Sequence, residues 1–185
     1  MNEPCEYDHS VALGKDYLGQ DCSLARALEI VGERWTLLVL RDCFLGVRRF
    51  SDFRAHLDAP RAVLAERLGA LVSAGLLERR PYRPGRDEYL MTECAIQLWP
   101  TVFALGQWGE DNLAPRGRRR IYAHAECGTD VETTGICPTC LMVPGPADLE
   151  VRPGPGSDPG KRDDPVSRAL RQPHRLLTPL LATIG

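Results

Sequence analysis

The chain has 185 residues, of which 43% are hydrophobic and 26% charged, and its formal net charge is −2. This length provides one main domain with at most a small satellite. No apolar run approaches the roughly 18 to 20 residues that cross a bilayer, and the acidic start MNEPCEYDHS differs from a signal peptide. These features predict a cytoplasmic protein without a membrane partner. The seven cysteines of such a chain favour thiols or metal ligands over a disulfide framework.

The charge is unevenly distributed along the chain. Residues 46–86 hold nine arginines against four acidic residues, a formal charge of +5. Residues 87–112 hold five acidic residues and no lysine or arginine. A near-neutral protein with one positive face can bind a polyanion. The alternative is that these charges are scattered over an ordinary solvated surface and bind no polyanion.

Two helices are predicted after the acidic leader. Ser23 can cap a short amphipathic helix that ends at Gly32. Its apolar positions recur at i, i+4 and i+7, and they are Leu24, Leu28 and Val31. The next helix, over residues 35–45, is apolar on most sides and ends at Gly46, as expected of a helix in the middle of a small domain.

A helix-turn-helix is predicted next. Ser51 can cap a short helix with Phe53 and Leu57 inward, and Pro60 fits only in the first turn of a further helix that ends at Gly75. The inward stripe of this further helix is Leu64, Leu68, Leu71 and Val72, and its outward residues are Arg61, Ala62, Ala65 and Glu66.

Two short strands and a long helix complete the predicted domain. The segments LLERRPY, RPGR and DEYLM predict a hairpin, or wing, with its turn at Pro84 and Gly85. A helix from Thr92 to about Asn112 follows, interrupted at Pro100. Leu98, Val102 and Leu105 lie on one apolar stripe of this helix. This order predicts an α+β, mainly α, winged helix-turn-helix fold.

The outward face of the second helix of the pair suits the DNA major groove. Ala62 and Ala65 are small enough for close approach to base edges, and Arg61 can reach a base or a phosphate. Arg67 adjoins the inward Leu68, so a structural role is an alternative for it. The candidate DNA-binding residues are Arg48, Arg49, Ser51, Arg61, Ala62, Ala65, Arg67, Arg83 and Arg86, the last two at the wing tip.

Four segments, CSLARALEIVGERWTLLVLRD, RRFSDFRAHL, VLAERLGALVSAGLLERR and DEYLMT, resemble the HxlR-type transcriptional regulators over residues 22–112. The resemblance implies a bacterial DNA-binding regulator, expected to be a repressor, that forms a homodimer through the first helix or leader and the long helix. It also implies a palindromic operator, and a small-molecule inducer is a further candidate partner. Ala62, Cys94 and Ala95 depart from the family pattern, so the operator sequence is not carried over.

Cys22 is a redox-sensing candidate. It occupies the position at which several members of the resembling family sense quinones, electrophiles or oxidants. A thiol at a helix N-terminus is stabilised as the thiolate by the helix dipole. The alternative is a cysteine that acts as a small buried hydrophobic residue.

A second candidate site lies behind the long helix. His124, Cys127, Cys137 and Cys140 form HxxC and CxxC pairs, which supply the four nitrogen or sulfur ligands of a structural zinc ion. Some HxlR-type proteins resemble this chain in carrying a similar tail. Leu141 stands where a turn glycine would be usual, and free thiols or a CxxC redox pair are the alternatives. The run RGRRR at residues 116–120 is either a further phosphate contact or a solvated linker.

The expected organisation has five parts: a leader at 1–21, the winged helix at 22–112, a zinc-binding knuckle at 113–143, a disordered Pro/Gly linker at 144–165 and an apolar segment at 166–185. The four histidines fall in separate segments, so a DNA-binding regulator is expected rather than an enzyme. The alternative is a protein-interaction adaptor built on the winged helix and the knuckle, whose binding would depend weakly on salt.

Overall fold

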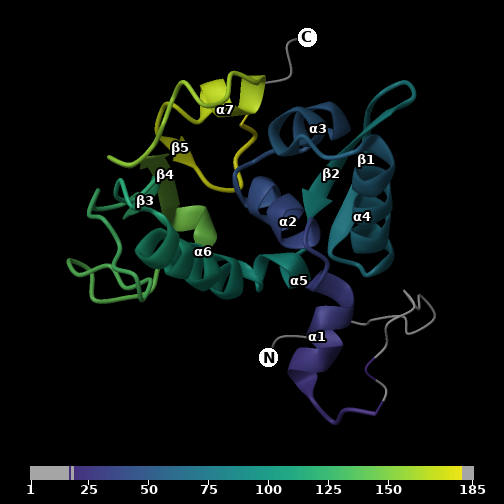
Figure 1. Cartoon of the computed structure of the whole chain (residues 1–185), viewed down its shortest axis with the longest axis horizontal. Coiled ribbons are helices and arrows are strands. Elements are labelled where there is room, and N and C mark those ends of the chain that lie inside the picture. Colours follow the sequence, from purple (N-terminus) through teal and green to yellow (C-terminus); the bar gives the residue numbers. More distant parts are fainter. Residues whose placement is uncertain (1–16, 18, 181–185) are drawn as a thin grey trace. The chain divides into compact units, whose positions relative to one another are not determined.

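The computed structural model describes residue 17 and residues 19–180 (Figure 1). The chain forms two compact units. The first unit holds the residues up to Arg41 together with Arg48–Gln97, and the second holds Asp42–Val47 and the residues from Leu98 onward. Most of the predicted leader and the last five residues of the predicted C-terminal segment lie outside the described residues. Among the residues described, we find no helix with the length and hydropathy that a bilayer crossing requires.

Four helices precede the hairpin, as predicted: α1 (Ser23–Val31), α2 (Thr36–Phe44), α3 (Phe50–Leu57) and α4 (Arg61–Ser73). The predicted caps are displaced by one or two residues. Cys22 and Arg49 have extended backbone and are the N-caps of α1 and α3, so Ser23 and Ser51 lie in the first turns instead. The last residues of α2 belong to the second unit.

The apolar positions predicted for α1 are only partly buried. Leu24 and Leu28 are 66% and 42% exposed, whereas Ala25 and Val31 are buried. The helix therefore uses its smaller apolar residues for intramolecular packing and presents two leucines to solvent.

The helix-turn-helix itself agrees with the prediction. Phe53 of α3 is buried, as are the three leucines of α4, Leu64, Leu68 and Leu71. Asp58 ends α3 in the left-handed region with φ 54°, and Pro60 precedes the first residue of α4. Short polar side chains tolerate this left-handed conformation, which reverses the chain between the helices.

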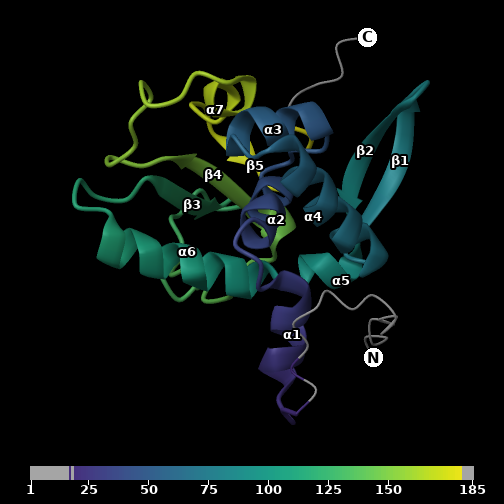
Figure 2. The ribbon, with the colours of Figure 1, turned by 45° about the vertical axis from the view of Figure 1, so that its right-hand side comes forward.

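The predicted wing is an antiparallel hairpin of β1 (Leu77–Arg83) and β2 (Arg86–Met91), seen beside α4 in Figure 2. Gly85 supplies the positive φ of 69° that its turn requires. The Tyr89 amide donates to the Arg48 carbonyl at 2.7 Å, and Arg49 forms a β-bridge with Glu88. These bonds attach the wing to the chain that enters α3.

The predicted long helix is two helices, α5 (Glu93–Ile96) and α6 (Trp99–Leu113). Pro100 lies in the first turn of α6, where its missing N–H leaves no helical bond unmade. Leu105 of the predicted apolar stripe is 51% exposed, and the buried face of α6 is formed by Trp99, Phe103 and Gln107. Trp99 and Phe103 pack their rings against Tyr122, with centroids 5.5 and 5.4 Å apart.

The second unit contains a sheet that the sequence analysis did not predict. Strands β3 (Arg120–His124), β4 (Leu149–Pro153) and β5 (His174–Arg175) are antiparallel in the order β3-β4-β5. The 3₁₀ turn η1 (Pro146–Asp148) precedes β4, and α7 (Pro165–Ala169) precedes β5. The basic run before β3 faces acids of α6, since Arg118 binds Asp111 at 2.9 Å and the Arg119 amide donates to Glu110.

The segment 144–165 is not the disordered linker that its composition predicted. It contains η1 and β4, and Leu149 and Val151 are buried. A Cβ on Gly154 or Gly156 would stand 2.2 or 1.9 Å from the carbonyl oxygen of Arg118 or Gly117. These glycines therefore allow two backbone segments to pack closely.

Candidate DNA-binding face and metal centre

Helix α4 presents a narrow face to solvent. Arg61, Ala62 and Ala65 are exposed, while the leucines of the same helix are buried against its own unit. The Arg61 guanidinium lies over the Phe50 ring, 5.8 Å from its centroid. This cation–π contact orients the arginine at the start of the helix.

Arg67 must be corrected as a candidate DNA contact. It is only 8% exposed, and its guanidinium donates to the carboxylate of Glu66, the neighbouring residue. Arg67 follows the buried stripe of α4 beside the fully buried Leu68, so its side chain contributes to the packing of the helix. We therefore leave Arg67 out of the DNA-binding face.

The other candidate residues come from the chain before α3, from α3 and from the wing. Arg48 and Arg49 are half-buried, Ser51 is exposed and donates to Asp52 at 3.1 Å, and Arg83 and Arg86 pair across the exposed wing tip. The Arg49 guanidinium lies 4.8 Å from the centre of the Tyr82 ring. The two supporting rings, Phe50 and Tyr82, were not among the predicted site residues, although each is an aromatic residue next to arginines in the sequence.

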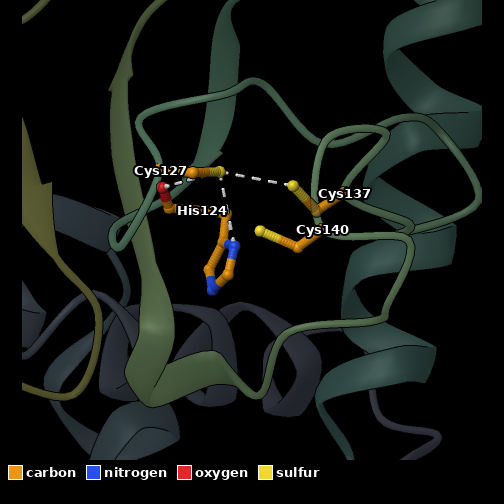
Figure 3. Close-up of side chains that lie close together, drawn as sticks. All are labelled: His124, Cys127, Cys137 and Cys140. Carbon is orange, nitrogen blue, oxygen red and sulfur yellow. Dashed lines mark hydrogen bonds between the residues drawn. The ribbon is translucent and has the colours of Figure 1, made fainter.

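The four predicted metal ligands converge at one point of the second unit. The Sγ atoms of Cys127, Cys137 and Cys140 and a ring nitrogen of His124 all lie within 4.8 Å of one another (Figure 3). Cys127 Sγ is 3.5 Å from both His124 Nδ1 and Cys137 Sγ. Bonds of about 2.3 Å to a tetrahedral zinc ion separate sulfur ligands by roughly 3.8 Å, so the cluster fits zinc.

Two tight turns present these ligands. The Gly128 amide donates to the His124 carbonyl at 2.8 Å, and the Leu141 amide donates to the Cys137 carbonyl at the same distance. The residue after each ligand pair has positive φ, 72° at Gly128 and 54° at Leu141. Leu141 thus adopts the left-handed conformation that a turn glycine usually adopts. The ligand turn therefore forms with leucine in place of glycine.

The thiols of the cluster influence one another. Hydrogen bonds from Thr129 lower the pKa of Cys127 to about 6, whereas the neighbouring Cys127 raises the pKa of Cys140 to about 12. The cluster therefore favours deprotonation of Cys127 and opposes deprotonation of Cys140. A divalent cation would reverse this opposition, because metal binding releases the protons of its thiol ligands. Glu126 places a carboxylate oxygen 3.9 Å from His124 Nε2, on the other side of the ring.

Two further thiols differ in their environment. Cys22 is exposed and precedes α1 as its extended N-cap. Cys43, near the end of α2, is buried, and burial raises its pKa well above the ordinary value. The structure therefore makes Cys22 accessible and keeps Cys43 protonated.

The helix-turn-helix and its hairpin define the first unit as a winged helix-turn-helix. The family model of HxlR-like helix-turn-helix proteins matches residues 30–117. An uncharacterized HTH-type transcriptional regulator of Mycobacterium bovis is 42% identical over 137 residues, which cover 72% of this chain and 87% of that protein. The HTH-type transcriptional regulator YdeP of Bacillus subtilis is 31% identical over 104 residues, 53% of this chain and 81% of its own.

Solved structures agree with these relatives. The crystal structure of PA1607, assigned as a transcription factor, matches with a TM-score of 0.57 and 32% identity, over 74% of this chain and 87% of that one. The chain belongs to the HxlR-like helix-turn-helix family and is an HxlR-type transcriptional regulator. The family resemblance of residues 22–112 is thereby confirmed.

Proposed function

We propose that this regulator binds double-stranded DNA with α4 in the major groove and the β1–β2 wing on the adjacent backbone or minor groove. The observation that carries the proposal is the face of α4, where Arg61 stands over Phe50 and the small residues Ala62 and Ala65 are exposed. A helix with small outward residues can approach base edges closely, and flanking arginines neutralise phosphates.

The wing and the entry to α3 supply the remaining contacts in this proposal. Arg83 and Arg86 are exposed at the wing tip, and Arg48, Arg49 and Ser51 lie where the chain enters α3. The net charge of +5 over residues 46–86 supports a polyanionic partner. We propose that the protein acts in the cytoplasm as a repressor, without catalysis.

The salt dependence of binding tests this function. Fluorescence anisotropy would use the full chain and a duplex from the region upstream of its own gene. Arg61→Ala and Arg83→Ala should each weaken binding and reduce the slope of log affinity against log salt by about 1. Arg168→Ala, which removes an exposed arginine paired with Asp163 in the second unit, is the matched control. A weak salt dependence, unchanged in both variants, would favour the adaptor function instead.

We further propose a homodimer on a palindromic operator. Leu24 and Leu28 of α1 are exposed, and so are Leu105, Trp108 and Leu113 of α6. Apolar surface of this kind on a helix marks an interface, and a twofold dimer would pair two α4 helices on two half-sites. A small-molecule inducer remains a candidate partner of such a dimer.

We propose a structural zinc ion as the cofactor. His124, Cys127, Cys137 and Cys140 would hold it, and zinc would supply a tetrahedral cross-link between the two ligand turns. The close approach of the four ligand atoms supports this assignment. Metal analysis of the purified chain would test it.

We also propose that oxidants act on the regulator through Cys22. Its thiol is exposed and lies at the N-cap of α1, beside the leucines of the proposed dimer contact. Diamide treatment should weaken DNA binding by the wild-type protein and leave Cys22→Ser unaffected. An undiminished diamide response in Cys22→Ser would exclude this thiol.

A further inference from the structure

The C-terminal residues hold the turn that leads into the helix-turn-helix. We name residues 176–180 the C-terminal strap, and residues 42–47 the α2–α3 turn. The Leu177 amide donates to the Phe44 carbonyl at 2.8 Å, and the Leu180 amide donates to the Gly46 carbonyl at 3.1 Å. Both segments belong to the second unit, although in sequence the turn directly precedes α3, the first helix of the helix-turn-helix.

Gly46 makes this contact very close. Its φ of 83° lies in the left-handed region, and a Cβ there would stand 1.8 Å from the Thr178 carbonyl oxygen. The turn is also fully enclosed, because Phe44, Leu45 and Val47 are at most 5% exposed. Any side chain at residue 46 must therefore displace the strap or the turn.

The strap is connected to the metal ligands through backbone hydrogen bonds. The Leu176 amide donates to the Leu149 carbonyl at 3.0 Å, and Leu149 is the register partner of His124 in the β3–β4 ladder. A second connection runs through η1, where Asp148 accepts from the Ala125 amide and Ala147 accepts from the Arg175 guanidinium. Ala125, which follows the ligand His124, and Arg175, which precedes the strap, thus both bind to η1.

The turn continues directly into the candidate DNA-binding residues. Val47 is joined to Arg48, whose carbonyl accepts from Tyr89 of the wing. We propose that the metal centre is an effector site: a bound zinc ion orders the β3–β4–β5 sheet, the strap then holds the α2–α3 turn, and the turn sets the position of Arg48 and Arg49 for DNA. This inference rests on the proposed DNA and zinc binding.

Hydrogen exchange of the full chain tests the coupling without DNA. Removal of zinc by a chelator should increase amide exchange in peptides that cover the strap and the α2–α3 turn. Unchanged exchange in the turn after zinc loss would overturn the proposal. Anisotropy with the upstream duplex is the second measurement, and zinc removal should lower DNA affinity by a factor of about 5 to 150, the usual range of allosteric coupling.

Two glycine variants identify the strap as the connection. Gly46→Ala keeps all four ligands, so it should retain zinc but lose DNA affinity, and zinc removal should then have little further effect. Gly75→Ala is the matched control, because Gly75 has φ 67° but nothing within 4 Å of a Cβ. It should retain the wild-type response to zinc removal. If Gly46→Ala keeps that response as well, the strap is not the connection.

A milder variant covers the case in which Gly46→Ala does not fold. Leu180→Pro removes one amide donor to Gly46 near the end of the chain, and it should increase exchange in the α2–α3 turn while zinc stays bound. Wild-type exchange in this variant would count against the strap. Should the zinc-loaded wild-type chain bind no DNA at any salt concentration, the proposed function fails, and the exchange measurements still decide whether zinc orders the turn.

Discussion

The Arg49 guanidinium lies over the ring of Tyr82, 4.8 Å from its centre, and so connects the start of α3 with the wing. A contact of this kind contributes about 0.5 to 1 kcal/mol at an exposed site. We expect Tyr82→Ala to weaken DNA binding roughly two- to fivefold, because Arg49 loses the surface that orients it. Tyr82→Phe keeps the ring and should bind as the wild type does. Equal anisotropy curves for Tyr82→Ala and Tyr82→Phe would contradict this role.

Arg61 and Arg67 lie on the same helix and should respond differently to the loss of their charge. Arg61 is exposed and Arg67 is 8% exposed, paired with Glu66. We expect Arg61→Met to reduce the salt slope of DNA affinity by about 1 and Arg67→Met to leave that slope unchanged. The measurement is anisotropy over a series of salt concentrations. A reduced salt slope of DNA affinity in Arg67→Met would show that Arg67 contacts DNA after all.

Cys137 and Cys43 are both buried, but only Cys137 belongs to the metal cluster. Cys137→Ser should lower the zinc content from about one ion per chain to near zero, because a structural zinc site needs its four ligands. Cys43→Ala should retain the metal. Elemental analysis of both purified variants is the measurement. Zinc retained in Cys137→Ser would show that the ion is held elsewhere.

The exposed leucine of α1 should matter for assembly. Leu24 is 66% exposed, and a glutamate there would place a charge in the proposed dimer contact. Loss of a central interface contact costs about 2 kcal/mol or more, which weakens the dimer roughly thirtyfold. Sedimentation velocity would measure the shift toward monomer in Leu24→Glu. Leu141→Glu is the control, since Leu141 is 82% exposed in the knuckle and should leave the dimer intact.

The strap should loosen in acid. Partial burial lowers the pKa of His174 below its ordinary value of 6.5, against the opposing effects of Glu150 and the Thr178 carbonyl. A folded-state pKa below the unfolded one means that the folded state binds fewer protons. The resulting stability is complete above the unfolded pKa, near 6.5, and is lost as the pH falls through the lowered folded-state pKa. Exchange in the strap, corrected for intrinsic rates, should rise over this range.

A variant without a titrating ring provides the comparison for this prediction. His174→Gln keeps a polar side chain that can donate toward the Thr178 carbonyl, which lies 3.2 Å from His174 Nε2. We expect the pH dependence of strap exchange to become flat in this variant. An equally steep dependence in His174→Gln would assign the effect to another group.

The helix-turn-helix and the metal ligands could be predicted because their signals are local. Phe53 and Leu57 of α3, like Leu64 and Leu68 of α4, are four residues apart and buried. The four metal ligands stand in two short pairs. The wing could also be predicted from the sequence, since Gly85 marks the turn between its two short strands. Local signals of this kind need no knowledge of the rest of the chain.

The second unit could not be predicted because its packing depends on contacts between distant segments. Leu149 and Val151 alternate with polar residues, which is a strand signal, but the surrounding prolines and glycines concealed it. The buried face of α6 was not predicted, because Trp99 and Phe103 pack against Tyr122 of the unpredicted strand β3. The burial of Arg67 agrees with the structural alternative that its position beside Leu68 had left open.

The bond between Leu177 and Phe44 has a consequence for biosynthesis. A chain leaves the ribosome from its N-terminus, so the helix-turn-helix segment emerges long before its enclosing partner has been made. The close packing around Gly46 can be completed only after Thr178 and Leu180 have been translated. Products that terminate before residue 176 therefore lack an enclosed turn, and the helix-turn-helix segment waits through the synthesis of about 130 further residues for this partner.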